Sequence, residues 1–181
     1  EIGINHNGDL ELAKKLIKDA SDAGFDAVKF QKRTVEKVYT KEELSKIRES
    51  VFGKTNGDLK YGLEFSLEDY KKIDQICNKN NIIWFASCWD EASVSFVNKF
   101  NTPCFKIASA SLTDKKLLEY TKSKNKPILL STGMSSLEEI DKAINILDQT
   151  KLILMHSTSS YPCNLEELNL NVIKTLKNKY K

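Results

Sequence analysis

The chain has 181 residues, 40% hydrophobic and 29% charged, which is ordinary for one globular domain with a real core. The net charge of +3 is small and the lysines are dispersed, so composition gives no sign of a nucleic-acid partner. No apolar run approaches the about 20 residues of a transmembrane helix, so we expect no membrane partner. The 4 cysteines lack CxxC spacing, which indicates reduced thiols and a cytoplasmic protein.

Strand-like and helical patterns alternate along the chain. Apolar stretches of strand length lie at 2–5, 26–31, 82–87, 103–108, 127–131 and 152–156. Helical patterns lie at 10–23, after Ser66, at 91–100, at 114–123, after Ser136 and at 165–179. This alternation predicts βα units and therefore a parallel sheet with helices outside it.

Helix start signals support this assignment. Asp9 precedes the first helical pattern as an N-cap. Ser66 with Asp69, and Ser136 with Glu139, have the spacing of capping boxes. We therefore expect well-defined helix starts at these positions.

Segment 34–65 has a different character. It is charged, contains glycines at 53, 57 and 62, and has a helical pattern only over 41–51. We predict a long loop after the second strand, of the kind that is usually functional or mobile.

Two architectures fit parallel βα units: an open doubly wound sheet and a (β/α)8 TIM barrel. The GxGxxG fingerprint of an open nucleotide-binding sheet is absent. Polar residues stand at or just past most strand ends: Asn5, Lys29, Gln31, Ser87, Lys106, Ser109, Ser131 and Ser157. Barrels draw their site from the ends of many strands, so we predict a TIM barrel. A whole barrel needs about 250 residues, so 1–181 is expected to be a single barrel domain truncated to about six βα units.

Two lysines lie inside apolar strands, Lys29 in Ala-Val-Lys-Phe-Gln and Lys106 in Phe-Lys-Ile-Ala-Ser. A lysine is rarely buried without a partner, so the pair predicts a pocket for a carboxylate or phosphate. Two alternatives stay open from the residues alone. The strands could be solvated edges, or a lysine could form a Schiff base as in aldolases.

Three serines, Ser87, Ser109 and Ser131, end successive strands, and Ser131 leads through Thr-Gly-Met-Ser into a helix start. Helix N-termini bind anions, although serines also serve simply as caps. Together with Lys29 and Lys106 they predict a phosphate cradle.

The segment Glu-Ile-Gly-Ile-Asn-His-Asn-Gly opens the chain with a carboxylate, amides and an imidazole. His6 could be a metal ligand, an acid–base group or a packed loop residue. Glu1 needs a cationic partner, which could be Lys29 or Lys106.

Because the chain has only 2 histidines, His6 and His156, we expect no complete metal site within it. Hydroxyls and Tyr161 after the last strand suit a polyhydroxylated ligand, although loops are rich in such residues.

The ordered motifs EIGINHNG, VKFQ, FKIAS, LLSTGM and HSTSSYP resemble those of the sialic acid synthase family and span about 1–162. The resemblance implies condensation of phosphoenolpyruvate with an N-acetylated amino sugar. The product would be a nine-carbon 2-keto sugar acid, a sialic acid or a precursor for a surface polysaccharide.

The same resemblance implies roles for individual residues. Phosphoenolpyruvate would lie between Lys29 and Lys106, with Ser87, Ser109 and Ser131 on its phosphate. Glu1, Gln31 and Tyr161 match positions near the amino sugar, and Glu1 would assist proton transfer.

Other family features have no counterpart in this sequence. The family's divalent metal, Mn or Mg, is held by histidines on later strands, and its C-terminal antifreeze-like domain contributes to a homodimer. Neither part is in these 181 residues, so we expect the segment alone to be inactive.

Several residues depart from the family pattern. Ser111 and Ser159 replace an acidic residue and an asparagine on the sugar side, which argues against N-acetylmannosamine as the acceptor. Legionaminate-like and pseudaminate-like acceptors, or a precursor for a surface polysaccharide, stay open. Lys32 and Arg33 either serve a more anionic acceptor or lie in a solvated loop. Rival functions are a Schiff-base aldolase, another phosphoenolpyruvate barrel synthase, and a non-catalytic sugar-phosphate-binding paralogue.

Overall fold

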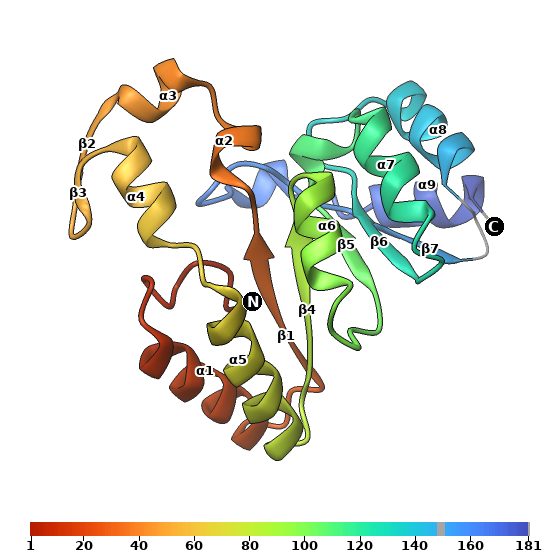
Figure 1. Ribbon diagram of the computed structural model, residues 1–181. Helices are drawn as coiled ribbons and strands as arrows, with labels where there is room; N and C mark the ends of the chain where they lie inside the picture. Colours follow the sequence, from red (N-terminus) through yellow and green to blue (C-terminus); the bar gives the residue numbers. More distant parts are fainter. Residues whose placement is uncertain (148–150, 181) are drawn as a thin grey trace. The chain divides into compact units, whose positions relative to one another are not determined.

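A computed structural model describes residues 1–147 and 151–180 of the protein (Figure 1). The chain divides into two compact units, Glu1–Pro103 and Cys104–Lys181. We call them the N-terminal unit and the C-terminal unit and describe each by itself.

The N-terminal unit combines parallel strands with covering helices. Its helices are α1 (Leu10–Asp22), α2 (Val35–Val38), α3 (Lys41–Ser45), α4 (Asn56–Gly62), α5 (Leu67–Lys79) and α6 (Glu91–Val97). Its strands are β1 (Ala27–Lys32), β2 (Ile47–Ser50), β3 (Gly53–Thr55) and β4 (Ile83–Cys88). Strands β1 and β4 pair in parallel, with Gln31 opposite Ser87. Helices α1 and α5 lie side by side in this unit (Figure 1).

The predicted helix caps are confirmed. Asp9 Oδ1 accepts from Glu11 N at 2.8 Å at the start of α1. Ser66 and Asp69 form a full capping box at the start of α5. These contacts satisfy amide groups that the first helical turn leaves without partners, which is why the helices begin where the sequence indicates.

The strand predicted at 2–5 is reduced to a single parallel bridge between Gly3 and Phe30. Ile2 N and Gly3 N both donate to Lys29 O, at 3.0 and 2.9 Å. Gly3 has φ +55°, a left-handed conformation that takes the chain out of strand geometry. The prediction of a full strand here is therefore wrong, although the segment does lie along β1.

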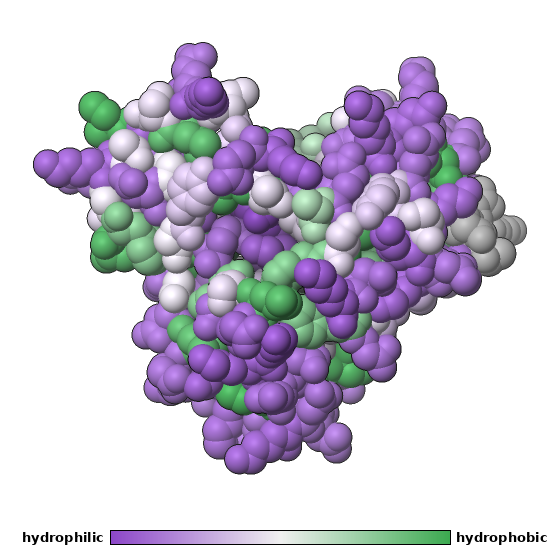
Figure 2. All heavy atoms as spheres, in the orientation of Figure 1, coloured by the Kyte–Doolittle hydropathy of each residue, from purple (hydrophilic) through white to green (hydrophobic). Residues whose placement is uncertain are grey.

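The prediction that 34–65 is a loop is also wrong. The helix expected over 41–51 ends at Ser45, and an antiparallel β2–β3 hairpin follows it. Local capping boxes, Thr40 with Glu43 and Thr55 with Asp58, start α3 and α4. Figure 2 shows hydrophobic surface over this hairpin, where Ile47 and Val51 are each 90% exposed.

Aromatic rings dominate the core behind β1 and β4. Tyr70 is buried, and its ring centroid lies 6.1 Å from that of Phe30, 5.5 Å from Trp84 and 5.1 Å from Phe96. Edge-to-face ring pairs add to the stabilisation from burial alone. This buried cluster packs against β1 on the side opposite the polar side chains of Lys29 and Gln31.

The C-terminal unit is a three-stranded parallel sheet with helices. Its strands are β5 (Phe105–Ile107), β6 (Ile128–Ser131) and β7 (Leu152–Met155), with β6 paired to both others. Its helices are the 3-10 turns η1 (Ser109–Ser111) and η3 (Leu165–Glu167), and α7 (Lys115–Lys122), α8 (Leu137–Ile146) and α9 (Val172–Lys179).

The core of this unit lies between the sheet and its helices. Ile107 and Leu130 from the strands are buried together with Leu118 of α7 and Ile140 of α8. The predicted capping box of Ser136 with Glu139 is confirmed at the start of α8.

The helix predicted over 165–179 is interrupted. A 3-10 turn ends at Glu167 and α9 begins only at Val172, because Asn169 between them has φ +44°. Among the described residues no helix is both long and apolar enough to cross a membrane.

Candidate functional site: two lysine–serine clusters

Lys29 forms the centre of a polar cluster in the N-terminal unit. Its Nζ lies 2.7 Å from Glu1 Oε1 and 2.6 Å from Glu1 Oε2, and it donates to Ser87 Oγ at 3.1 Å. The Lys29 side chain is only 17% exposed, whereas that of Glu1 is 53% exposed. Lys29 and Lys106 were the two cationic partners considered for Glu1, and in the structure Glu1 pairs with Lys29.

Lys106 forms a second cluster in the C-terminal unit. It is 6% exposed, and its Nζ donates to Ile107 O at 2.9 Å and to Ser131 Oγ at 2.5 Å. Ser157 Oγ donates in turn to Ser131 Oγ at 3.1 Å. A buried ammonium at a strand end favours an anionic ligand. The solvated-edge alternative is therefore wrong for Lys106.

The turn after β6 brings further hydroxyls to this cluster. Gly133 N donates to Ser109 Oγ at 3.0 Å. A Cβ at Gly133 would lie 2.8 Å from Ser157 O, 2.8 Å from Ser159 Oγ and 2.9 Å from Ser109 Oγ. Real Cβ atoms do not approach oxygen so closely, so the serines can gather here only around a glycine.

The structure thus brings the predicted residues together within each unit. Lys29, Ser87 and Glu1 meet in one, and Lys106, Ser109 and Ser131 gather near Gly133 in the other. The expectation that all of them hold one phosphoenolpyruvate stays a prediction.

The predicted residues on the sugar side are more scattered. Gln31 lies in β1, two positions after Lys29 and so on the same face of the strand. Ser111 is 8% exposed, and the Tyr161 side chain is fully exposed. The roles of Tyr161 and Ser159 stay predictions.

The sequence interpretation placed Ser157 at a strand end without giving it a role, and it missed Glu64. Ser157 supports Ser131, and Glu64 pairs with both Lys32 and Arg33. The position of Ser157 at a strand end was a usable signal. Glu64 had none, because it lies in the segment that was predicted to be a loop.

Lys32 and Arg33 do not lie in a solvated loop. Arg33 is 5% exposed and its Nε lies 2.9 Å from Glu64 Oε1, while Lys32 Nζ lies 2.8 Å from Glu64 Oε2. Because both cations are already paired with the Glu64 carboxylate, the structure does not favour the alternative that they bind a more anionic acceptor.

Of the three roles open for His6, the geometry supports a packed loop residue. It is 2% exposed and stacks on Phe65 with ring centroids 4.2 Å apart. Its Nδ1 accepts from Gly8 N at 3.0 Å, which fixes the neutral tautomer with the proton on Nε2. Burial, with a smaller contribution from the charge of Arg33, lowers the pKa of His6 from its ordinary 6.5 to about 4.

This pKa predicts a specific pH dependence of stability. Since the folded state favours neutral His6, its contribution is complete above pH 6.5 and is lost as the pH falls from 6.5 towards 4. His6→Asn keeps a side-chain acceptor for Gly8 N but removes the titration. We expect the free-energy difference between wild type and this variant, from urea unfolding, to shrink between pH 7 and pH 4.5. A difference that is constant with pH would contradict the assignment.

A metal site does not form from the described residues. No group of three or more His, Cys, Asp or Glu side chains among residues 1–147 and 151–180 could hold an ion. His156 is engaged elsewhere, since its Nε2 lies 2.7 Å from Leu168 O. The expected Mn or Mg ion with ligands outside this chain stays a prediction.

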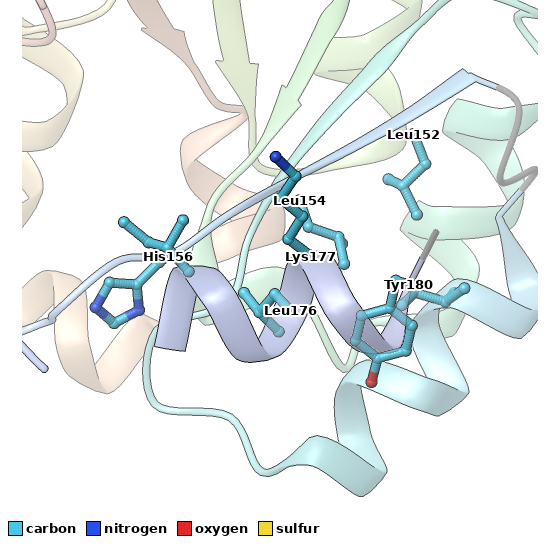
Figure 3. Close-up of a pocket in the computed structure, with 8 residues that line it drawn as sticks. Leu152, Leu154, His156, Leu176, Lys177 and Tyr180 are labelled. Atoms are coloured by element: carbon cyan, nitrogen blue, oxygen red, sulfur yellow. The ribbon is translucent and has the colours of Figure 1, made fainter. Parts of the chain in front are cut away.

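Two of the hollows in the C-terminal unit are lined in part by His156. Figure 3 shows one of about 290 Å³ between β7 and α9, with His156 at one end and Tyr180 at the other and leucines between them. Most of its lining is leucine and isoleucine, and His156, Lys177 and Tyr180 complete it. The other, of about 480 Å³, includes Gly133 and a hydroxyl-rich run from Ser157 to Ser160, which suits a polyhydroxylated ligand.

Parallel βα units with lysines and serines at their strand ends define an α/β protein of the barrel type. The NeuB family model matches residues 16–181, and the chain belongs to this family. The resemblance to sialic acid synthases is thereby confirmed.

Similar proteins agree with this assignment. The chain is 40% identical to an uncharacterized protein of Methanocaldococcus jannaschii, covering 98% of this chain and 50% of that protein. It is 35% identical to the N,N'-diacetyllegionaminic acid synthase of Campylobacter jejuni, covering 100% of this chain and 57% of that protein. The chain thus spans about half the length of the curated relatives it matches.

A solved structure confirms the fold. The crystal structure of N-acetylneuraminic acid synthetase from Leptospira borgpetersenii superimposes with a TM-score of 0.86 at 31% identity, covering 98% of this chain and 59% of that one. The predicted α/β class and truncated barrel are confirmed by this likeness.

Proposed function

We propose that the chain is the phosphoenolpyruvate-binding part of a synthase that condenses phosphoenolpyruvate with an N-acetylated amino sugar. The products are a nine-carbon 2-keto sugar acid and inorganic phosphate. The observation that carries the proposal is Lys106, a cation 6% exposed at a strand end, held on Ser131 beside the Ser109–Gly133 turn.

The proposed reaction forms a C–C bond between the two substrates and a C–O bond from C2 to water, and it breaks the C–O bond from C2 to phosphate. C3 of phosphoenolpyruvate attacks the open-chain aldehyde carbon of the sugar, and the aldehyde oxygen takes up a proton. Water adds to C2, and the tetrahedral intermediate expels phosphate. Lys29 and Lys106 stabilise the carboxylate and phosphate charges, which preorganised cations do best in a water-poor site.

Glu1 is our candidate for proton transfer, because its carboxylate is half-exposed and held by Lys29. Glu1→Gln preserves size but cannot accept a proton. We expect kcat to fall by about 10²–10⁴-fold while KM for phosphoenolpyruvate changes little. Steady-state kinetics on the complete enzyme measure both values. A kcat close to that of wild type would remove Glu1 from this role.

Ser111 and Ser159 lead us to expect an acceptor other than N-acetylmannosamine. They lack the acidic acceptor and the amide expected there, and mismatched buried polar groups discriminate strongly between substrates. We expect a diacetamido-dideoxy hexose to be preferred, as measured by kcat/KM for the two sugars side by side. Equal or better use of N-acetylmannosamine would show that these positions do not select the acceptor.

The direct test incubates the complete protein with phosphoenolpyruvate, each amino sugar and Mn²⁺. Phosphate release that depends on the sugar, together with a nine-carbon acid identified by mass spectrometry, would support the proposal. Borohydride trapping with pyruvate is the counter-test. A covalent adduct on a lysine would instead indicate a Schiff-base aldolase. Binding of phosphoenolpyruvate without turnover would indicate a non-catalytic paralogue.

A further inference from the structure

Arg33 is a buried cation that the proposed reaction does not use. It directly follows β1, is 5% exposed, and its guanidinium lies over the Trp89 ring at 5.3 Å from the centroid. Its Nη1 donates to Tyr39 Oη at 2.9 Å, and its Nη2 donates to Gln31 Oε1 at 2.6 Å. Its Nε lies 2.9 Å from Glu64 Oε1 but is not aligned for a hydrogen bond. The contact to Gln31 links Arg33 to the candidate site.

The contact with Gln31 decides how that amide is oriented. A guanidinium has only N–H donors, whereas a glutamine amide has an oxygen that accepts and a nitrogen that donates. If the amide turned over, its NH₂ group would face the N–H groups of Arg33, and two donors would oppose each other. Arg33 therefore holds the Gln31 amide with Oε1 facing the guanidinium and Nε2 directed away from it.

Gln31 continues the row that begins at Lys29. Lys29 and Gln31 lie on one side of β1, while Val28 and Phe30 are buried on the other, and Arg33 reaches Gln31 from just after the strand. Gln31 therefore presents donors beside the cluster of Lys29, Glu1 and Ser87. A ligand atom that meets Nε2 has to be an oxygen acceptor.

We propose that Arg33 is a positioning residue that locks the Gln31 amide, so that Gln31 donates from Nε2 to an oxygen of the amino-sugar acceptor. This inference rests on the proposed function. It deepens that function by assigning Gln31 a donor-only role, which selects a sugar with a hydroxyl or carbonyl oxygen at this position.

Lys32 provides a matched control for Arg33. It is also poorly exposed, pairs with the same Glu64 carboxylate at 2.8 Å, and has an aromatic contact with Phe96 at 5.0 Å. Its contacts are with Glu64, Phe65 O and Phe96, and do not include the Gln31 amide. Lys32→Met and Arg33→Met therefore disturb the same charge cluster, but only the second releases Gln31.

The kinetic test uses these two variants and Gln31→Glu in the complete enzyme. We expect Arg33→Met to raise KM for the amino sugar about tenfold, the loss of one oriented hydrogen bond, with KM for phosphoenolpyruvate changed less than about twofold. Lys32→Met should leave both KM values unchanged, and Gln31→Glu should match or exceed Arg33→Met. Arg33→Lys, which restores a donor, should recover part of the loss. Equal effects of Arg33→Met and Lys32→Met on the sugar KM would overturn the proposal.

A second measurement is independent of activity. Nitrogen-15 NMR detects the two N–H signals of the Gln31 side chain, identified by their loss in Gln31→Glu. A hydrogen bond to Oε1 strengthens the double-bond character of the amide, so rotation that interchanges the two protons should be several-fold slower in wild type than in Arg33→Met. Lys32→Met should rotate as slowly as wild type. If wild type condenses no amino sugar, the proposed function fails, but the NMR measurement still tests the orientation of the Gln31 amide. Equal rates of amide rotation in wild type and Arg33→Met would refute the proposed orientation.

Discussion

Replacing Lys106 with methionine is expected to lower kcat/KM for phosphoenolpyruvate by about 10²–10³-fold, the usual result of removing one preorganised electrostatic contact from an active site. Methionine fills nearly the same space but removes the ammonium that Ser131 Oγ and Ile107 O now hold. Stability should change little, because the protein no longer has to bury a charge and Ser131 keeps its contact with Ser157. Steady-state kinetics and a thermal melt on the complete enzyme measure the two effects.

Lys142 offers a matched control for this variant. Its side chain is 69% exposed and pairs with Glu138 at 2.7 Å on α8. Because exposed ion pairs contribute about 0–1 kcal/mol, Lys142→Met should leave the kinetics within about twofold of wild type. Similar kinetic losses in both lysine variants, or a loss below about threefold in Lys106→Met, would remove Lys106 from the site.

Gly133→Ala is expected to weaken phosphoenolpyruvate binding by about 5- to 150-fold, the equivalent of about 1–3 kcal/mol of overpacking. The new methyl group would lie 2.8 Å from Ser157 O and 2.9 Å from Ser109 Oγ. Ser157 O is backbone and cannot swing aside, so the hydroxyls and the Gly133 amide have to move. Titration of the complete enzyme with phosphoenolpyruvate by calorimetry measures the effect.

Gly24 provides the comparison for a glycine outside the site. A Cβ there meets no atom within 4 Å, but its φ of +81° makes alanine strained. Gly24→Ala should therefore cost about 1–2 kcal/mol of stability and leave the affinity for phosphoenolpyruvate unchanged. If Gly133→Ala reduced stability alone, as Gly24→Ala does, the turn after β6 would be structural and not part of the anion site.

Features that depend on neighbouring residues could be predicted from local sequence patterns. Caps such as Asp9 and the Ser136–Glu139 box were predictable, because a helix start is satisfied by residues within three positions of it. Lysines inside apolar strands were also informative, since a strand's periodicity shows which positions a core would reject. The family followed from ordered motifs.

Features that depend on partners distant in sequence could be read only from the folded chain. Glu1 could have paired with Lys29 or Lys106, and it pairs with Lys29; Arg33 could have been solvated, and it is buried against Glu64. The burial of a charged side chain depends on which carboxylate the fold delivers to it, and Glu64 arrives from a segment whose hairpin carries a weak local pattern. The orientation of the Gln31 amide is the clearest case. Its two ends are alike in sequence, and only a guanidinium 2.6 Å from Oε1 distinguishes them.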